Sequence, residues 1–190
     1  MEYIERGFRE SGAVTICITG DAGDYINTFR HRFDPYVERI MPHITLMFAQ
    51  DLDVAMWQSV RLPIQEGLAH ITPFRVCVGS TGVFHGDTPV LWLLPEDEHG
   101  EIAAIRGVLL GATSGVAVER VRDFVPHISI GFFDQEESLM SARQAVDTDL
   151  QPFDFRVAFL SFLRADDNDV WHCVDTLNLG ESGSSTIQGC

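Results

Sequence analysis

The sequence predicts a protein of the α/β or α+β class, with helices layered outside β-sheets and with two similar lobes. Short runs of β-branched residues alternate with amphipathic segments, which indicates strands and helices in turn. A seven-residue segment recurs in the second half of the chain, which indicates a repeated lobe. The 190 residues, 45% of them hydrophobic, fit one well-buried domain, which we expect over residues 1–179.

The first half of the chain predicts two strands, each followed by a helix. The earliest strand is rich in β-branched residues and lies between Gly12 and Gly20. Asp21 is a suitable N-cap for the first helix, and Asp51 or Asp53 for the second. The expected elements are a strand at residues 13–19, a helix at 23–33, a strand at 42–49 and a helix ending near residue 67.

The second half predicts a hairpin, two further helices and three further strands. The glycine-rich segment 79–82 is typical of a turn and would join the two strands of the hairpin. Residues 180–190 are rich in Gly and Ser and predict a flexible tail. The expected elements are strands at 74–79 and 90–94, a helix at 101–110, a strand at 124–133, a helix at 135–146, and strands at 155–164 and 169–179.

The chain is strongly acidic, with a formal net charge of -15 at pH 7, and each of its 13 basic residues is Arg. Such a charge repels polyanions, so we expect no long nucleic acid as a partner but a small nucleotide or a short oligonucleotide. No apolar run approaches the roughly 20 residues that a membrane helix needs. The first residues also lack the pattern of a secretory signal. We expect a cytoplasmic monomer without a membrane partner.

The cysteines predict neither a disulfide nor a metal site. Cys17, Cys77 and Cys173 each lie in an apolar, strand-like run, where a buried thiol is expected, and Cys190 ends the polar tail. No pair has the Cys-x-x-Cys spacing of a zinc site. We therefore expect no metal and no cofactor.

The repeat consists of PHITLMF at residues 42–48 and PHISIGF at residues 126–132, which align without a gap. Because side chains alternate along a strand, the His and the hydroxyl residue of each copy share one face. His43, Thr45 and Met47 are expected on the polar face of the first copy, and Ile44, Leu46 and Phe48 in the core. His127, Ser129 and Gly131 are expected on the polar face of the second copy, and Ile128, Ile130 and Phe132 in the core.

Two such strands could bring two imidazoles and two hydroxyls to one site. One imidazole could take a proton while the other gives one, because the ordinary pKa of His lies near neutral pH. The hydroxyls could donate to phosphoryl oxygens and position them for attack. This chemistry suits a ribose 2',3'-cyclic phosphate or a 2'-5' phosphodiester and needs no metal. His70-Ile71-Thr72 is a third His-x-Thr, but Pro73 interrupts the alternation after it, so we expect His70 in a helix end or a loop.

The two seven-residue segments resemble the paired His-x-Thr/Ser signatures of the 2H phosphoesterase superfamily, which includes bacterial 2'-5' RNA ligases and cyclic nucleotide phosphodiesterases. The resemblance covers most of residues 13–179, and FRHRFDPY at 29–36 further resembles the small bacterial branch. It implies a bilobal α+β fold with a pseudo-twofold axis, in which two antiparallel sheets form a V-shaped cleft with helices outside. It implies metal-independent phosphodiester chemistry, with His43 as the acid and His127 as the base. Thr45 and Ser129 would hold phosphate oxygens.

Three further residues are candidates for substrate binding. Tyr36 and Arg30 could reach a terminal phosphate, although a solvated helix face would equally account for Arg30 and Arg32. Phe133 could stack on a base, although an aromatic residue packed on its own lobe would also fit the pattern.

Three kinds of function remain open on the sequence. The first is a metal-independent phosphodiesterase acting on a small ribose phosphodiester, such as a 2',3'-cyclic phosphate, a 2'-5' linkage or a cyclic oligonucleotide. The second is a nucleotide- or RNA-binding module that keeps the fold without catalysis, in which His43 and His127 are structural. The third is a metallohydrolase, which a chelator would inactivate.

Overall fold

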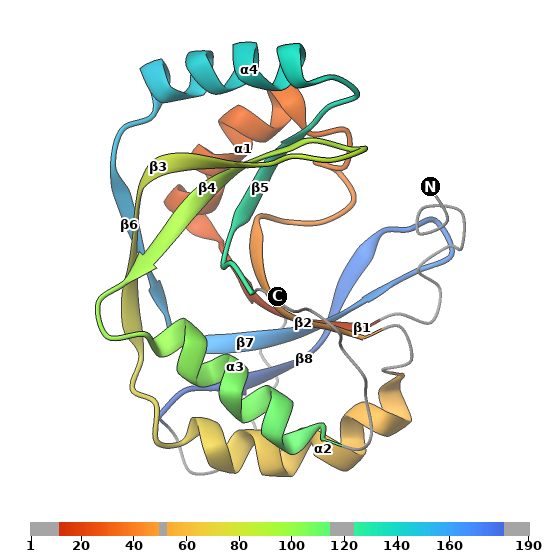
Figure 1. Cartoon of the computed structure of the whole chain (residues 1–190). Coiled ribbons are helices and arrows are strands. Elements are labelled where there is room, and N and C mark those ends of the chain that lie inside the picture. The colour runs from red at the N-terminus through yellow and green to blue at the C-terminus, as the bar shows by residue number, and fades with distance from the viewer. Residues whose placement is uncertain (1–11, 50–52, 115–123, 181–190) are drawn as a thin grey trace.

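The computed structural model describes residues 12–49, 53–114 and 124–180 (Figure 1). The described chain alternates strands with helices, as the sequence predicts. The elements are β1 (Gly12–Cys17), α1 (Gly20–Phe33), β2 (His43–Ala49), α2 (Val54–Leu68), β3 (Phe74–Phe84), β4 (Val90–Asp97), α3 (Glu101–Ala112), β5 (Ile128–Phe132), α4 (Glu136–Asp149), β6 (Phe153–Val157), β7 (Phe159–Ala165) and β8 (Trp171–Asn178).

The described strands form two four-stranded antiparallel sheets. The β1 sheet has the order β2-β1-β7-β8, and the β4 sheet has the order β5-β4-β3-β6. The two orders are similar, because each repeat strand, β2 or β5, is an edge strand and pairs with the strand that precedes it in the chain, β1 or β4. The bilobal α+β fold expected from the sequence is confirmed. Figure 1 shows the two sheets inclined to each other and joined on one side, where β6 continues into β7.

The helices cover the two sheets in a crossed arrangement. α2 and α3 lie along the β1 sheet, whereas α1 and α4 lie over the β4 sheet (Figure 1). α1 follows β1 in the chain yet packs on the other sheet, and α3 likewise follows β4 and packs on the β1 sheet. Trp57 of α2 stacks on Phe162 of β7 with ring centroids 4.4 Å apart, and Tyr25 of α1 contacts Phe153 of β6 edge-on at 5.2 Å. Each half of the chain therefore supplies part of the other half's core.

Three expected strands differ in the structure. The segment 79–82 is not a turn: β3 continues to Phe84, and the pairing with β4 shifts register between Val78 and Thr81, which marks a bulge. The expected strand 155–164 is two strands in different sheets, separated by Ala158. The strand expected at 124–133 begins only at Ile128, so His127 directly precedes it.

The helix starts were predicted with mixed success. Asp53 is the N-cap of α2, because its side chain accepts a hydrogen bond of 2.7 Å from the backbone N–H of Met56. Asp21 is not a cap: α1 begins at Gly20 after Thr19, and Asp21 lies in its first turn, where its charge still favours the helix dipole. Asp51, the alternative cap for α2, lies outside the described residues.

Three other expectations can be compared with the described residues. None of the helices described here is long and apolar enough to span a bilayer. The prediction of buried thiols was wrong, because Cys77 is exposed and Cys17 and Cys173 are half-buried. Cys190 and the expected tail after residue 180 lie outside the described residues, and the single-domain boundary at 179 stays a prediction.

Candidate active site

The β1 sheet presents Thr45 on the face that points away from the helices. Val14 of β1 pairs with Phe162, which stacks on Trp57 of α2, so Val14 faces the helices. Thr15 follows Val14 and therefore faces the opposite way, and Thr45 pairs directly with Thr15. We call this side of each sheet, opposite its helices, the signature face.

The β4 sheet presents Ser129 in the same way. Thr81 of β3 donates a hydrogen bond to Asp147 of α4, so Thr81 and its pairing partner Leu93 face the helices. Trp92 precedes Leu93 and faces the opposite way, and Ser129 pairs with Trp92. The two hydroxyl residues of the repeat therefore lie on the two signature faces.

Each repeat strand contains a β-bulge directly after its hydroxyl residue. In β2, Thr45 and Met47 pair with consecutive residues of β1, which leaves Leu46 without a partner in that ladder. In β5, Ser129 and Gly131 pair with consecutive residues of β4, which leaves Ile130 without one. Bulges are common beside active sites, where they redirect side chains.

The bulges correct the predicted alternation. Met47 and Gly131 are buried rather than on the polar face, whereas Phe48 and Phe132 are half-buried rather than fully in the core. Side chains alternate between the two faces of a strand, so one extra residue moves every later side chain to the opposite face. The predicted faces are correct for the residues before each bulge, and these include both His and both hydroxyl residues.

The two imidazoles are anchored by equivalent backbone carbonyls. Nδ1 of His43 lies 2.9 Å from the carbonyl oxygen of Met41, and Nδ1 of His127 lies 2.8 Å from that of Val125. A carbonyl oxygen only accepts, so Nδ1 carries the proton in both rings. Nε2 of each neutral ring then keeps its lone pair, which is the state of a proton acceptor.

His127 lies close enough to His43 to affect the pKa of that ring. Burial lowers the pKa of His43 to about 4; the hydrogen bond to Met41 opposes this, and the neighbouring Arg30 and His127 lower the pKa further. Burial also lowers the pKa of His127, against its hydrogen bond to Val125. The edge strands β2 and β5 also contact each other. The structure therefore brings the two signatures together between the sheets.

Two aromatic rings surround His127. The Phe84 ring meets it edge-on with centroids 4.9 Å apart, and the Trp92 ring lies 6.2 Å away. The Trp92 ring rests on Gly82, where a Cβ would approach ring atoms to 2.2 Å, so only glycine leaves room for it. Sequence reasoning missed Phe84 and Trp92, although β3 and β4 were expected to pair as a hairpin. The expected turn at 79–82 ended the first strand of the hairpin too early, whereas β3 continues to Phe84.

Arg30 is buried beside His43 rather than on a solvated helix face. It is 2% exposed, its Nε donates to Asp34 Oδ2 at 2.8 Å, and its Nη1 donates to Asn27 Oδ1 at 3.2 Å. Asp34 also lies near His43 and raises the pKa of that ring, against the effect of Arg30. The solvated-face interpretation holds only for Arg32, which is exposed.

Tyr36 lies between the loop after α1 and the end of β5. Its backbone N–H donates to Asp34 Oδ1 at 2.8 Å, and its ring meets Phe132 edge-on at 5.2 Å. The half-buried Tyr36 therefore stands beside the signature face of the β4 sheet.

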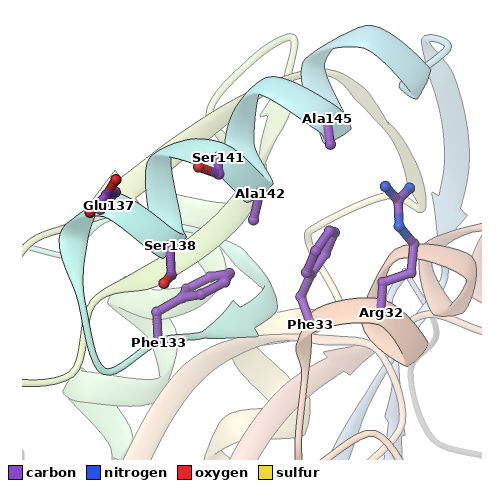
Figure 2. Close-up of a pocket in the computed structure, with 8 residues that line it drawn as sticks. All are labelled: Arg32, Phe33, Phe133, Glu137, Ser138, Ser141, Ala142 and Ala145. Atoms are coloured by element: carbon purple, nitrogen blue, oxygen red, sulfur yellow. The ribbon is translucent and has the colours of Figure 1, made fainter.

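Phe133 lies in a different place from the imidazoles. Figure 2 shows it under α4, beside Phe33 of α1, and the two ring centroids are 6.2 Å apart. These rings and Arg32 line a pocket of about 640 Å³ with residues of α4, and none of the four signature residues lines it. Phe133 thus packs on its own lobe, the alternative that the sequence left open.

Two remaining expectations concern His70 and metals. His70 lies exposed in the turn after α2, as the interrupted alternation predicts. Within the three described segments of the chain, no group of three or more His, Cys, Asp or Glu side chains is arranged to hold a metal ion.

Two equivalent lobes, each presenting a His-x-Thr or His-x-Ser pair from an edge strand, define a 2H-type phosphoesterase. The chain belongs to the 2'-5' RNA ligase superfamily, whose family model matches residues 20–169. It is 28% identical over 162 residues to a Staphylococcus haemolyticus protein named "Putative phosphoesterase SH1944", covering 82% of this chain and 91% of that one. A Halalkalibacterium halodurans protein, "Putative phosphoesterase BH1439", is 26% identical over 161 residues, covering 83% and 91%.

Solved structures share the fold. E. coli LigT complexed with 3'-AMP superposes with a TM-score of 0.68 at 14% identity, covering 90% of this chain and 99% of that one. The same E. coli protein complexed with NADP+ gives a TM-score of 0.62 at 17% identity, covering 90% and 99%. The bilobal architecture is therefore that of LigT.

Proposed function

We propose that this protein is a metal-independent phosphodiesterase that acts on a small ribose phosphodiester between His43 and His127. The substrate class comprises 2',3'-cyclic phosphates, 2'-5' linkages and cyclic oligonucleotides. The observation that carries the proposal is the equivalent anchoring of the two rings, because each Nδ1 bonds to a carbonyl two residues earlier. A ring held in this way can exchange a proton only through Nε2.

The proposed step is hydrolysis of one phosphorus–oxygen bond. One Nε2 takes a proton from water as the water oxygen bonds to phosphorus, and the other Nε2 gives its proton to the departing ribose oxygen. The hydroxyls of Thr45 and Ser129 donate to the two phosphoryl oxygens that stay on phosphorus. The product is a phosphate monoester, and the two rings finish with exchanged protonation states.

The two rings have the same charge state near pH 7. Burial lowers the pKa of both, so His43 and His127 are each mostly neutral and either can enter the reaction as the base. The ring that acts as the acid first takes up a proton on Nε2, and the family resemblance implies that role for His43. In the opposite direction of the reaction the two roles exchange.

Small nucleotides are the favoured substrates. E. coli LigT, which shares the fold, has been crystallised with 3'-AMP, ATP and NADP+. The net charge of -15 would repel a long polyanion, whereas a mononucleotide or dinucleotide needs only local donors. Tyr36, half-buried beside the signature face, is the candidate contact for the parts of such a substrate beyond the reacting phosphate, whereas Arg30 is 2% exposed and bonded to Asp34 and Asn27.

The proposal is tested by assaying the wild type, His43→Ala and His127→Ala in EDTA against 2',3'-cyclic nucleotides, 2'-5' dinucleotides and cyclic dinucleotides. We expect wild-type turnover, and a loss of roughly 100-fold or more in each variant, because each removes a general acid or base. His70→Ala is the matched control, since this exposed His-x-Thr histidine lies outside the site.

Two outcomes would contradict the proposal. A wild type that binds nucleotides but turns over none of the panel would indicate a non-catalytic binding module. Activity that appears only when a divalent cation is supplied would indicate a metallohydrolase.

A further inference from the structure

Arg106 of α3 is a buried arginine that lies beside both signatures. It is 7% exposed, and α3 packs against β2. Burying a guanidinium is costly unless its donors are matched, so its contacts indicate what it stabilises. Nothing in the family signatures involves this residue.

The first contact is with the bulge of β2. Nη1 of Arg106 donates a hydrogen bond to the carbonyl oxygen of Leu46. Leu46 is the bulge residue, which has no partner residue in β1. Because Thr45 directly precedes Leu46, this bond fixes the backbone beside the hydroxyl of the first signature.

The second contact is with the segment that leads to His127. The guanidinium carbon of Arg106 lies 4.2 Å from the centroid of the Phe124 ring, a cation–π contact. Phe124 directly precedes Val125, whose carbonyl accepts the hydrogen bond from Nδ1 of His127. One side chain therefore contacts the backbone of the first signature and the ring of the residue that directly precedes the anchor of the second.

We propose that Arg106 is a positioning residue that holds the Thr45 strand and the His127 anchor in a fixed relation to each other. Its catalytic consequence rests on the proposed function, whereas its effect on the His127 ring does not. Without Arg106, the Leu46 carbonyl loses a buried donor and Phe124 loses its cation–π contact, so the two signatures lose a common support. Small displacements of this kind are costly, because a misplacement of about 1 Å can lower a rate about 100-fold.

The test compares Arg106→Met, Arg106→Lys and Phe124→Leu with the wild type. We expect Arg106→Met to lower kcat for a 2',3'-cyclic mononucleotide about 100-fold while KM changes less than about threefold. Lys can still donate to Leu46 but lacks the planar guanidinium, so Arg106→Lys should recover part of the kcat. Arg143→Met, in α4 and away from both signatures, is the matched control and should keep the wild-type kcat.

A second measurement does not depend on activity. The ¹⁵N chemical shifts of the imidazoles report which nitrogen carries the proton, and we expect the Nδ1–H form for His43 and His127 in the wild type. In Arg106→Met and in Phe124→Leu, the signals of His127 should shift toward a mixture of the two neutral forms. An inactive wild type with these spectral changes would contradict the proposed function and leave the positioning role standing.

The inference is overturned if folded Arg106→Met keeps both the wild-type kcat and the wild-type His127 signals. A variant that only unfolds at a lower temperature, with those two quantities unchanged in its folded form, would show a structural role alone. If Arg106→Met does not fold, Arg106→Lys and Phe124→Leu decide the question, and unchanged His127 signals in both would reject the inference.

Discussion

His43 and His127 are held by equivalent carbonyls but lie among different neighbours. His43 lies near the buried Arg30–Asp34 ion pair, whereas Phe84 and Trp92 surround His127. Burial is the largest cause of the lowered pKa at both rings, and at His43 the charges of Arg30 and Asp34 add smaller effects of opposite sign. The two imidazoles are therefore similar in geometry and distinct in chemistry.

The lowered pKa of His43 predicts a pH-dependent loss of stability. Above the ordinary pKa of 6.5 the ring is neutral in both the folded and the unfolded chain. Between pH 6.5 and about 4 only the unfolded chain takes up this proton, so the free energy of unfolding falls as the pH falls. The contribution of this group is roughly 3 kcal/mol at most.

Urea unfolding at several pH values between 7 and 4 measures this effect by comparing the wild type with His43→Asn. Other groups titrate in the same range, so the informative quantity is the difference in unfolding free energy between the two proteins. We expect the stability of the wild type relative to His43→Asn to decline as the pH falls. A difference that stays constant over the range would show that the folded ring titrates normally.

The residues of the candidate site could be predicted most directly where the repeat identifies them. The two His and the two hydroxyl residues follow from matching segments and from the alternation of a strand. Arg106 and the burial of Arg30 could not be predicted, because each depends on a helix packed against residues distant in the sequence. A single arginine in an amphipathic segment gives the same local pattern whether it is buried or solvated.

Among the elements, the edge strands β2 and β5 determine what the site presents. Each carries its bulge directly after the hydroxyl residue, and a helix packs against each, α3 on β2 and α1 on β5. At β5 the approach is close, because a Cβ on Gly131 would lie 2.8 Å from the Cβ of Phe33. Glycine at this position allows α1 and β5 to come together.

Gly131→Ala should therefore destabilise the protein by about 1–3 kcal/mol, as overpacking does in a tight core. Gly107→Ala is the matched control, because this exposed position in α3 has no atom within 4 Å of an added Cβ. The control should be neutral or stabilising by up to about 1 kcal/mol, since Ala favours a helix more than Gly. Thermal unfolding of the two variants measures both effects, and equal shifts would contradict the close packing at β5.

The order of the elements could be predicted, but not the points where a strand bends or changes sheet. Residues 155–164 form one continuous run in the sequence, and no local signal marks Ala158 as the crossing between sheets. The glycines at 79 and 82 favour a turn by composition, yet they serve a bulge and the packing of Trp92. Both differences arise from contacts between strands, which a local pattern does not contain.

At the scale of the whole molecule, the crossed helices make the two lobes depend on each other. α1 is needed to cover the β4 sheet and α3 to cover the β1 sheet, although each belongs to the other half of the chain (Figure 1). Neither half contains its complete core. We therefore expect the two lobes to unfold together in one cooperative transition.

This expectation can be measured by ¹⁹F NMR during urea unfolding of protein labelled with 5-fluorotryptophan. Trp57 reports on the β1 sheet and its helix α2, and Trp92 reports on the β4 sheet. The native signals of both should disappear with the same midpoint. Separate midpoints would show two lobes that fold independently.

The two lobes themselves could be predicted from the repeat, whereas the exchange of helices between them could not. A repeat indicates that two units are alike, but both an exchanged and an unexchanged arrangement satisfy the same amphipathic patterns.

The equivalent anchoring of the two rings also has a consequence for the orientation of the proposed substrate. Two equivalent carbonyls hold two equivalent nitrogens, so under the proposed function the signatures by themselves would offer a phosphate two nearly identical approaches. Only the surroundings tell the two ends of the site apart: an ion pair at one end and aromatic rings at the other. The residues around the two imidazoles would therefore determine the direction in which a substrate binds. Exchanging those neighbouring residues between the two ends of the site would reverse that direction.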